Sequence, residues 1–118
     1  MSEEGQEMKI DCHMHVNGGT RKWGWKSNDL IIDAADRLGI DQLCVSIPVT
    51  RGMPTMAEVR SCNDGVIQAM RRYPERILGY CFVVPGYREA TDEIDRCLEE
   101  GMMGVKLYNQ YKIWDPAV

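Results

Sequence analysis

The sequence lacks the long apolar run that a membrane-spanning helix requires. Its longest apolar stretch, around residues 77–85, is far shorter than the ~18–20 residues that cross a bilayer. The first seven residues are acidic and polar, unlike a secretory signal. We therefore expect a cytoplasmic protein with no membrane partner.

The sequence also lacks an excess of positive charge. The chain of 118 residues carries 14 Lys and Arg against 18 Asp and Glu, a formal net charge of −4. Proteins that bind a phosphate backbone concentrate positive charge, so nucleic acid is not expected as a partner. With 44% hydrophobic residues the chain is of ordinary globular composition. We expect a polar tail over residues 1–7 and one domain over residues 8–118.

Paired cysteine spacings are absent. The five cysteines are an odd number without a Cys-x-x-Cys pair, whereas a disulfide framework or a zinc ribbon needs paired spacing. Because all five fall inside apolar segments, small buried thiols are the expected state. These residues are Cys12, Cys44, Cys62, Cys81 and Cys97.

Four short apolar runs, at residues 8–12, 42–47, 76–84 and 103–108, predict strands covered on both faces. The segments between them have the apolar spacing of amphipathic helices, the first capped by Ser27 or Asn28 and ended by Gly39. The predicted helical faces contain Leu30, Ile31, Ala34, Ala35 and Leu38, then Val59, Val66, Ile67 and Met70, then Ala90, Ile94, Cys97 and Leu98.

Alternating strands and helices predict an α/β fold with a parallel sheet. Eight units with this spacing would total about 250 residues, the usual size of a (β/α)8 barrel. The chain holds three and a half such units and ends in the fourth strand and its loop. We expect the first half of a TIM-type barrel, with an open four-stranded α/β sheet as the alternative.

The first strand contains the segment with the most chemical information. Residues two apart on a strand point to the same face, so Asp11, His13 and His15 are expected to share one face at its carboxyl end. Two imidazoles at this spacing suit zinc and its first-row neighbours. A core histidine placed there by chance is the simpler alternative, but the chain has only two histidines and both lie here.

The Asp-x-His-x-His segment resembles the opening motif of the amidohydrolase superfamily of metal-dependent hydrolases. Later segments are similar to its amidohydrolase-related (amidohydrolase-2) branch, which includes decarboxylases, and the resemblance covers residues 8–116. Phosphoesterases and nucleases with the same opening are disfavoured, since neither Ser46 to Val49 nor Lys106 matches their later motifs. The segments that carry the resemblance are Asn63, residues 73–79 and residues 101–107.

The resemblance implies that His13 and His15 bind one divalent metal ion, for which we predict zinc. Asp11 would support them as a carboxylate that orients a metal-bound imidazole. Lys106 is predicted to act catalytically inside the pocket, the alternative being a lysine that extends out of the barrel end. The implied reaction is hydrolysis of an amide, ester or lactone by metal-activated water, or decarboxylation of a carboxylated small-molecule substrate.

Loops after the strands provide further candidates for substrate binding. Aromatic rings beside cations can close over an aromatic or carboxylated substrate, although an ordinary solvated loop explains the same residues. The candidates are Arg21, Trp23, Trp25, Arg51, Tyr108 and Asn109.

The family pattern implies further metal ligands from later strands, so this chain alone is expected to be catalytically incomplete. A half-barrel also leaves two sheet edges unpaired. Three hypotheses follow: part of a longer enzyme completed by a C-terminal half, a homo-oligomer that closes the barrel itself, or a non-catalytic interaction module.

Overall fold

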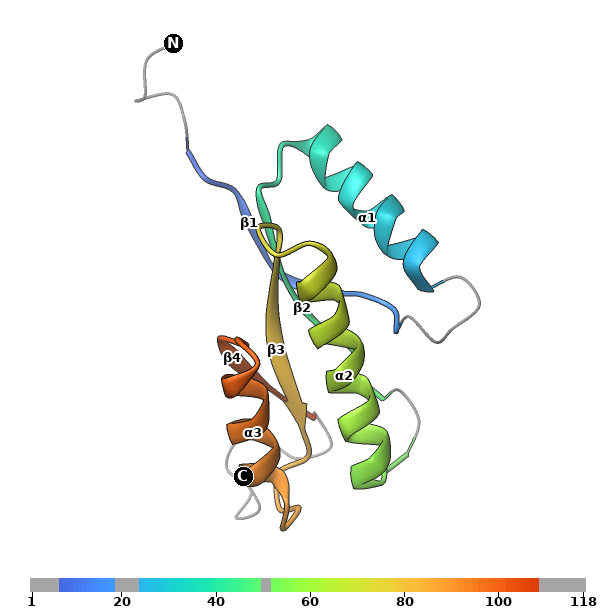
Figure 1. The fold of residues 1–118 in the computed structure, drawn as a ribbon, viewed down its shortest axis with the longest axis vertical. Coiled ribbons are helices and arrows are strands. Elements are labelled where there is room, and N and C mark those ends of the chain that lie inside the picture. Colours follow the sequence, from blue (N-terminus) through green and yellow to red (C-terminus); the bar gives the residue numbers. More distant parts are fainter. Residues whose placement is uncertain (1–6, 19–23, 50–51, 109–118) are drawn as a thin grey trace.

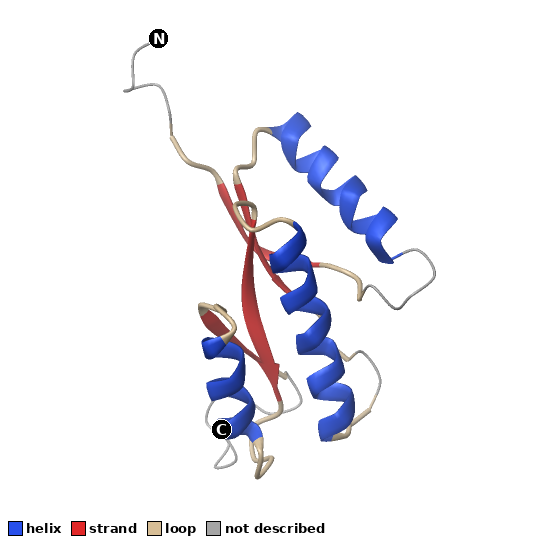
Figure 2. Ribbon diagram, in the orientation of Figure 1, coloured by secondary structure: helices blue, strands red, loops and turns tan. Residues whose placement is uncertain are grey.

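A computed structural model describes residues 7–18, 24–49 and 52–108. Strands and helices alternate along the chain, and the helices lie together along one side of the strands (Figures 1 and 2). The strands are β1 (Ile10–His15), β2 (Gln42–Ser46), β3 (Ile77–Val83) and β4 (Gly104–Leu107), and the helices are α1 (Gly24–Leu38), α2 (Met56–Arg72) and α3 (Ala90–Glu99).

The four strands form one sheet in the order β1-β2-β3-β4, and every neighbouring pair is parallel. The predicted α/β fold with parallel strands is therefore confirmed. The strands follow one another around a curled sheet with helices on its outside, which is the arrangement of the first half of a (β/α)8 barrel.

The layer between the sheet and the helices is the main hydrophobic core. It combines strand residues such as Leu43, Val45 and Cys81 with helix residues such as Val66 and Cys97, all at most 4% exposed. Gly79 lets α2 approach β3 closely, because a Cβ atom there would lie 2.4 Å from the Met70 sulfur. We call this layer the helix-facing core.

The helix ends follow local signals. Thr55 caps α2 by accepting a hydrogen bond from the Glu58 N–H, and Glu58 accepts one from the Thr55 N–H in return. Gly39 follows α1 with a φ of 69°, a conformation that glycine adopts without a Cβ penalty. The predicted end of the first helix is thus confirmed.

Several local predictions were wrong. The first strand runs over Ile10–His15, later than predicted, and α1 begins at Gly24, so that Asn28 lies inside the helix, 1% exposed. Leu30 and Leu38 are 60% and 67% exposed, because the buried side of α1 is centred on Ala35. Cys12 is an exposed thiol, whereas Cys44, Cys81 and Cys97 are buried as expected.

In the described part of the chain, no helix is both long enough and apolar enough to span a membrane. The molecule measures 52 × 35 × 25 Å along its principal axes.

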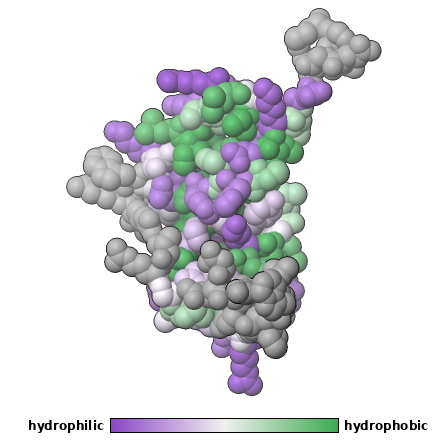
Figure 3. Space-filling model, turned by 180° about the vertical axis from the view of Figure 1, so that it is seen from behind, coloured by the Kyte–Doolittle hydropathy of each residue, from purple (hydrophilic) through white to green (hydrophobic). Residues whose placement is uncertain are grey.

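None of the three described helices lies over the opposite face of the sheet. Seen from behind, hydrophilic and hydrophobic residues lie next to one another on this side (Figure 3). We call it the concave face, because side chains from the two outermost strands approach each other on it, as the next subsection describes.

Candidate functional site

A β-bulge in β1 places both histidines on the concave face. Asp11 pairs in register with Leu43 and Met14 with Val45, so Cys12 and His13 together stand opposite the single residue between those partners. The two imidazole rings lie 5.2 Å apart between centroids and almost perpendicular, at 87°. The predicted convergence of His13 and His15 on one face is confirmed.

Asp11 lies elsewhere. Its register partner Leu43 belongs to the helix-facing core, so the bulge separates Asp11 from the face that carries the imidazoles. The expectation that all three residues share one face was wrong, because strict alternation does not continue through a bulge. The Asp11 carboxylate accepts a hydrogen bond of 3.0 Å from the backbone N–H of His13 and so supports the bulge itself.

The backbone of β2 determines the tautomer of His15. Its Nδ1 lies 3.1 Å from the carbonyl oxygen of Ser46. Because a carbonyl only accepts hydrogen bonds, Nδ1 is the donor in this contact, and in the neutral ring Nε2 carries the lone pair. A ring held by a backbone carbonyl on one nitrogen and free on the other is the usual state of a metal-binding histidine.

The side chain of His13 lies close to a lysine on the strand at the opposite edge of the sheet. Its Nε2 lies 3.5 Å from Nζ of Lys106. β1 and β4 are separated by three strand spacings, about 14 Å in a flat sheet. The contact between their side chains therefore shows that the sheet curls around the concave face. In the described residues no carboxylate lies within ion-pair distance of Lys106.

The residues present fit a divalent metal ion in part. Two imidazoles on one face are suitable donors for zinc and related ions, although in this structure Nε2 of His13 contacts Nζ of Lys106. A catalytic metal site usually has three protein ligands, and the described residues contain no group of three or more His, Cys, Asp or Glu that could hold a metal. Any third ligand has to come from outside these residues.

Two substrate-binding candidates lie among the described residues, and each has a printed contact with another side chain. Trp25, in the first turn of α1, has the guanidinium carbon of Arg72 5.4 Å above its ring. Tyr108 is 7% exposed, packs edge-on against Phe82 and donates its hydroxyl hydrogen bond to the Gly52 carbonyl. Trp25 is thus packed on a neighbour, as the alternative of an ordinary loop predicts, and a substrate contact by either residue stays a prediction. Arg21, Trp23, Arg51 and Asn109 lie outside the described residues.

Sequence reasoning missed two residues that shape the site. Ser46 supplies the carbonyl that orients His15, and its place at the end of the strand after the histidine motif was the available signal. Glu93 is buried in α3 and no spacing indicated it. Burial raises the pKa of its carboxyl, but hydrogen bonds from Arg96 and Asn63 outweigh this and hold the pKa below its ordinary value.

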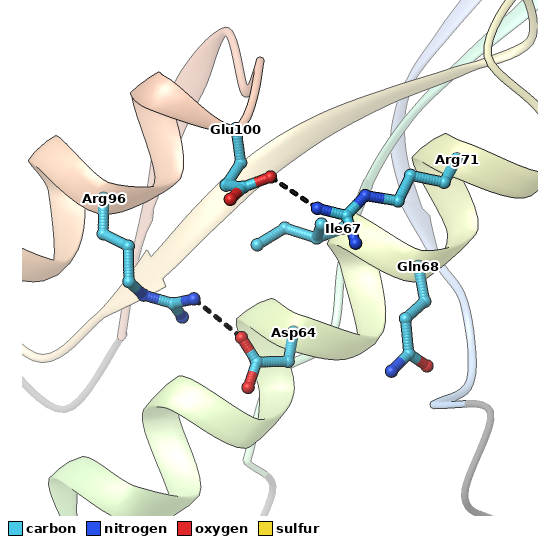
Figure 4. A pocket seen from close by; sticks show the side chains of 6 residues that line it. All are labelled: Asp64, Ile67, Gln68, Arg71, Arg96 and Glu100. Carbon is cyan, nitrogen blue, oxygen red and sulfur yellow. Dashed lines mark hydrogen bonds and ion pairs between the residues drawn. The ribbon is translucent and has the colours of Figure 1, made fainter.

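A shallow groove between α2 and α3 lies on the helical side of the molecule, away from the histidines. Its charged residues pair across the groove, Arg71 with Glu100 and Arg96 with Asp64 (Figure 4). These pairs join the two helices and leave no unmatched charge for a ligand. The groove is lined by Asp64, Ile67, Gln68, Arg71, Arg96 and Glu100.

Comparison with solved structures identifies the fold. The 5-carboxyvanillate decarboxylase of Novosphingobium aromaticivorans, solved with manganese and 3-methoxy-4-hydroxy-5-nitrobenzoic acid, matches 89% of this chain with a TM-score of 0.69 and 16% identity. A 2,6-dihydroxybenzoate decarboxylase from Rhizobium matches 85% with a TM-score of 0.62 and 20% identity. A probable 2-pyrone-4,6-dicarboxylic acid hydrolase from Acinetobacter baumannii, solved with citric acid, matches 94% with a TM-score of 0.60 and 19% identity.

The match covers only part of each of these proteins. The chain spans 42%, 38% and 43% of their respective lengths, or about two fifths. No family model and no curated protein sequence matches the chain. The chain therefore has the fold of part of these decarboxylases and of this hydrolase.

Proposed function

We propose that this chain supplies the first two metal ligands of a metal-dependent hydrolase or decarboxylase that acts on a small molecule. The observation that carries the proposal is the pair of imidazoles on the concave face, with Nδ1 of His15 held by Ser46 and Nε2 free. The resemblance of the Asp-x-His-x-His motif to the amidohydrolase superfamily and the fold of the structural neighbours support it.

In the proposed site, Nε2 of His13 and Nε2 of His15 hold one divalent ion. Such an ion, when bound, lowers the pKa of a coordinated water or polarises a substrate oxygen. We propose zinc from the donor types, while the decarboxylase of Novosphingobium aromaticivorans was solved with manganese. Both ions therefore belong in the test.

The other residues of the chain have separate roles in this proposal. Asp11 holds the bulge by its bond to the His13 N–H. Lys106 is the proposed catalytic residue, because its Nζ reaches the space beside His13 from the opposite strand. There its ammonium group can donate a hydrogen bond to a substrate oxygen. Substrate contacts by Arg21, Trp23, Arg51 and Asn109 stay predictions, as does the cytoplasmic location.

We further propose that four more β/α units complete the barrel. In the described residues, β1 and β4 each pair with one neighbour only, so the sheet has two free edges. Both edges carry exposed apolar side chains of the kind that another layer covers, with exposed fractions of 42–58%. These are Ile10 at the first edge and Met103, Val105 and Leu107 at the second.

Metal binding tests the proposed function directly. Zn²⁺ and Mn²⁺ are titrated separately into the wild-type chain, and the ¹H–¹⁵N signals of the imidazoles are recorded. The chain has only two histidines, so every imidazole signal reports on the site. We expect both rings to shift with Zn²⁺ and to broaden with Mn²⁺, and His13→Ala/His15→Ala to abolish binding with the fold retained.

Cys12→Ala is the matched control, because a neighbouring exposed thiol could bind Zn²⁺ by itself. The control is expected to bind like the wild type. Equal metal affinity in the wild type and in the double histidine variant would overturn the proposal.

The exposed edges also favour a second candidate function, a non-catalytic interaction module. Light scattering of the metal-loaded chain separates the ways of completing the sheet. A dimer would mean that a second copy supplies the missing strands, whereas a monomer would assign them to the C-terminal half of a longer enzyme. An interaction module predicts that partner binding survives the double histidine substitution.

A further inference from the structure

The carboxamide of Asn63 pairs with a strand as another strand would. Asn63 lies in the middle of α2 and is fully buried. Its Oδ1 accepts a hydrogen bond of 2.8 Å from the Phe82 N–H, and its Nδ2 donates one of 3.0 Å to the Phe82 carbonyl. Both polar groups of one residue of β3 are thus satisfied by a single side chain.

This pairing occurs where β2 has separated from β3. The paired residues of β2 and β3 end at Val45 and Gly79. The carbonyls of Gly79 and Val83 accept hydrogen bonds from N–H groups at the two ends of β4. Since backbone groups alternate in direction along a strand, those of Phe82 point toward β2. Asn63 therefore occupies the place that β2 has left.

The Asn63 side chain is itself held in place. Its Nδ2 also donates a 2.8 Å hydrogen bond to the Glu93 carboxylate. Arg96 donates two hydrogen bonds to Glu93, of 2.7 and 2.9 Å, and one to Asp64. Figure 4 shows the last of these contacts joining α3 to α2. With both amide hydrogens and the oxygen engaged, the carboxamide has one orientation.

We infer that Asn63 is a positioning residue for the candidate site. Phe82 is the register partner of Lys106, so the bond that holds Phe82 also holds the strand pair that carries the lysine. Asn63 separates the pair β3–β4 from the pair β1–β2 in the part of β3 that follows Gly79. This separation sets the curl that brings Nζ of Lys106 to Nε2 of His13. The relevance of this contact to catalysis rests on the proposed function.

Asn28 provides a matched comparison within the same chain. Its carboxamide accepts a 2.8 Å hydrogen bond from the Asn17 N–H and donates a 2.9 Å bond to the Asn17 carbonyl. It is 1% exposed, like Asn63. However, Asn17 lies two residues after His15 and has no register partner in β4. Asn28 therefore holds only the segment that follows β1, and not the strand pair that carries Lys106.

The test measures the contact between the two strand pairs in the metal-free chain of 118 residues. A nuclear Overhauser cross-peak between the imidazole protons of His13 and the Hε protons of Lys106 is recorded for the wild type. Asn63→Ala is expected to lose this cross-peak while those within β1–β2 and within β3–β4 remain. Asn28→Ala is expected to retain it and to shift the signals of His15 instead.

Asn63→Ala leaves room for water to pair with Phe82, which favours a folded variant over the isosteric Asn63→Leu. As a second variant, Glu93→Gln removes the charge but keeps an acceptor for Asn63, so the cross-peak is expected to persist even if the protein is less stable. A wild-type cross-peak in Asn63→Ala, or its equal loss in Asn28→Ala, overturns the inference. Failure of the proposed metal binding would leave these metal-free results unchanged.

Discussion

The two faces of the sheet differ in what covers them. The helix-facing core is closed by α1, α2 and α3 and contains apolar side chains that are almost completely buried. The concave face carries His13, His15 and Lys106, whose side chains meet across the sheet. One backbone thus presents a packed layer on one side and ionisable groups on the other.

The comparison teaches that this fold separates stability from chemistry. Buried apolar surface on the helix side supplies the favourable free energy of folding. The histidines are exposed and Lys106 is half-buried, so these side chains contribute little to that packing. The backbone of the strands connects the two faces, and Asn63 hydrogen-bonds to this backbone from the helix side.

The largest expected effect comes from a cavity in the helix-facing core. Leu43 is 1% exposed, and Leu43→Ala is expected to lower the free energy of unfolding by about 2–5 kcal/mol. The neighbouring Gln42→Ala, on the other side of the strand, is expected to change it by less than about 0.5 kcal/mol. Urea unfolding followed by circular dichroism measures both. Equal losses would mean that the two faces do not differ in packing.

A smaller effect is expected from the polar network between the helices. The Glu93 side chain is 2% exposed and pairs with Arg96, whereas that of Glu100 is 39% exposed and pairs with Arg71. Glu93→Gln is expected to cost about 1–3 kcal/mol because buried donors lose a charged acceptor. Glu100→Gln is expected to cost at most about 1 kcal/mol. Urea unfolding at neutral pH compares the two, and a reversed order would contradict the structure.

The same carboxyl predicts a pH dependence. Its pKa is lower in the folded protein than the ordinary value of 4.5, so the unfolded chain binds the proton more readily. Its stabilising contribution is complete above that ordinary value and is lost as the pH falls through the lower, folded-state pKa. Unfolding free energies measured from about pH 6 to about pH 3 test this, because that range brackets the ordinary pKa of a carboxyl group. In Glu93→Gln the decline is expected to be shallower.

The smallest perturbation is chemical labelling of the thiols. Cys12, within the bulge of β1, is exposed, whereas Cys44, Cys81 and Cys97 are buried. A hydrogen bond with Cys81, together with burial, raises the pKa of the Cys97 thiol and disfavours the reactive thiolate. Brief treatment with iodoacetamide is expected to modify Cys12 first. Mass spectrometry of the peptides would contradict this if Cys97 reacted as fast.

Local patterns predicted most of the elements because they report local physics. Gly39, at positive φ, follows the end of α1 where the sequence indicated, and the apolar runs marked all four strands. The boundaries failed where tertiary contacts compete with local signals. Asparagine is a common helix-capping residue, yet the carboxamide of Asn28 hydrogen-bonds to the Asn17 backbone from inside α1.

The spacing of His13 and His15 predicted that both imidazoles lie on one face of the first strand. Their role as metal ligands and the catalytic role of Lys106 stay predictions. The bulge that separates the histidines from Asp11 was not predicted, since it depends on how β1 pairs with β2. The role of Ser46 also depends on that pairing, because its carbonyl contacts His15 of β1. The role of Asn63 depends instead on where β2 separates from β3, because it bonds to the Phe82 backbone.

The sequence by itself determined the order of elements, the parallel sheet and the two histidines at the end of the first strand. Periodicity and glycine positions are local, so they can be read without knowing the fold. Only the tertiary structure decided that Lys106 meets His13 and that a buried asparagine separates β2 from β3. Both depend on the curl of the sheet, which arises from contacts between residues distant in the chain.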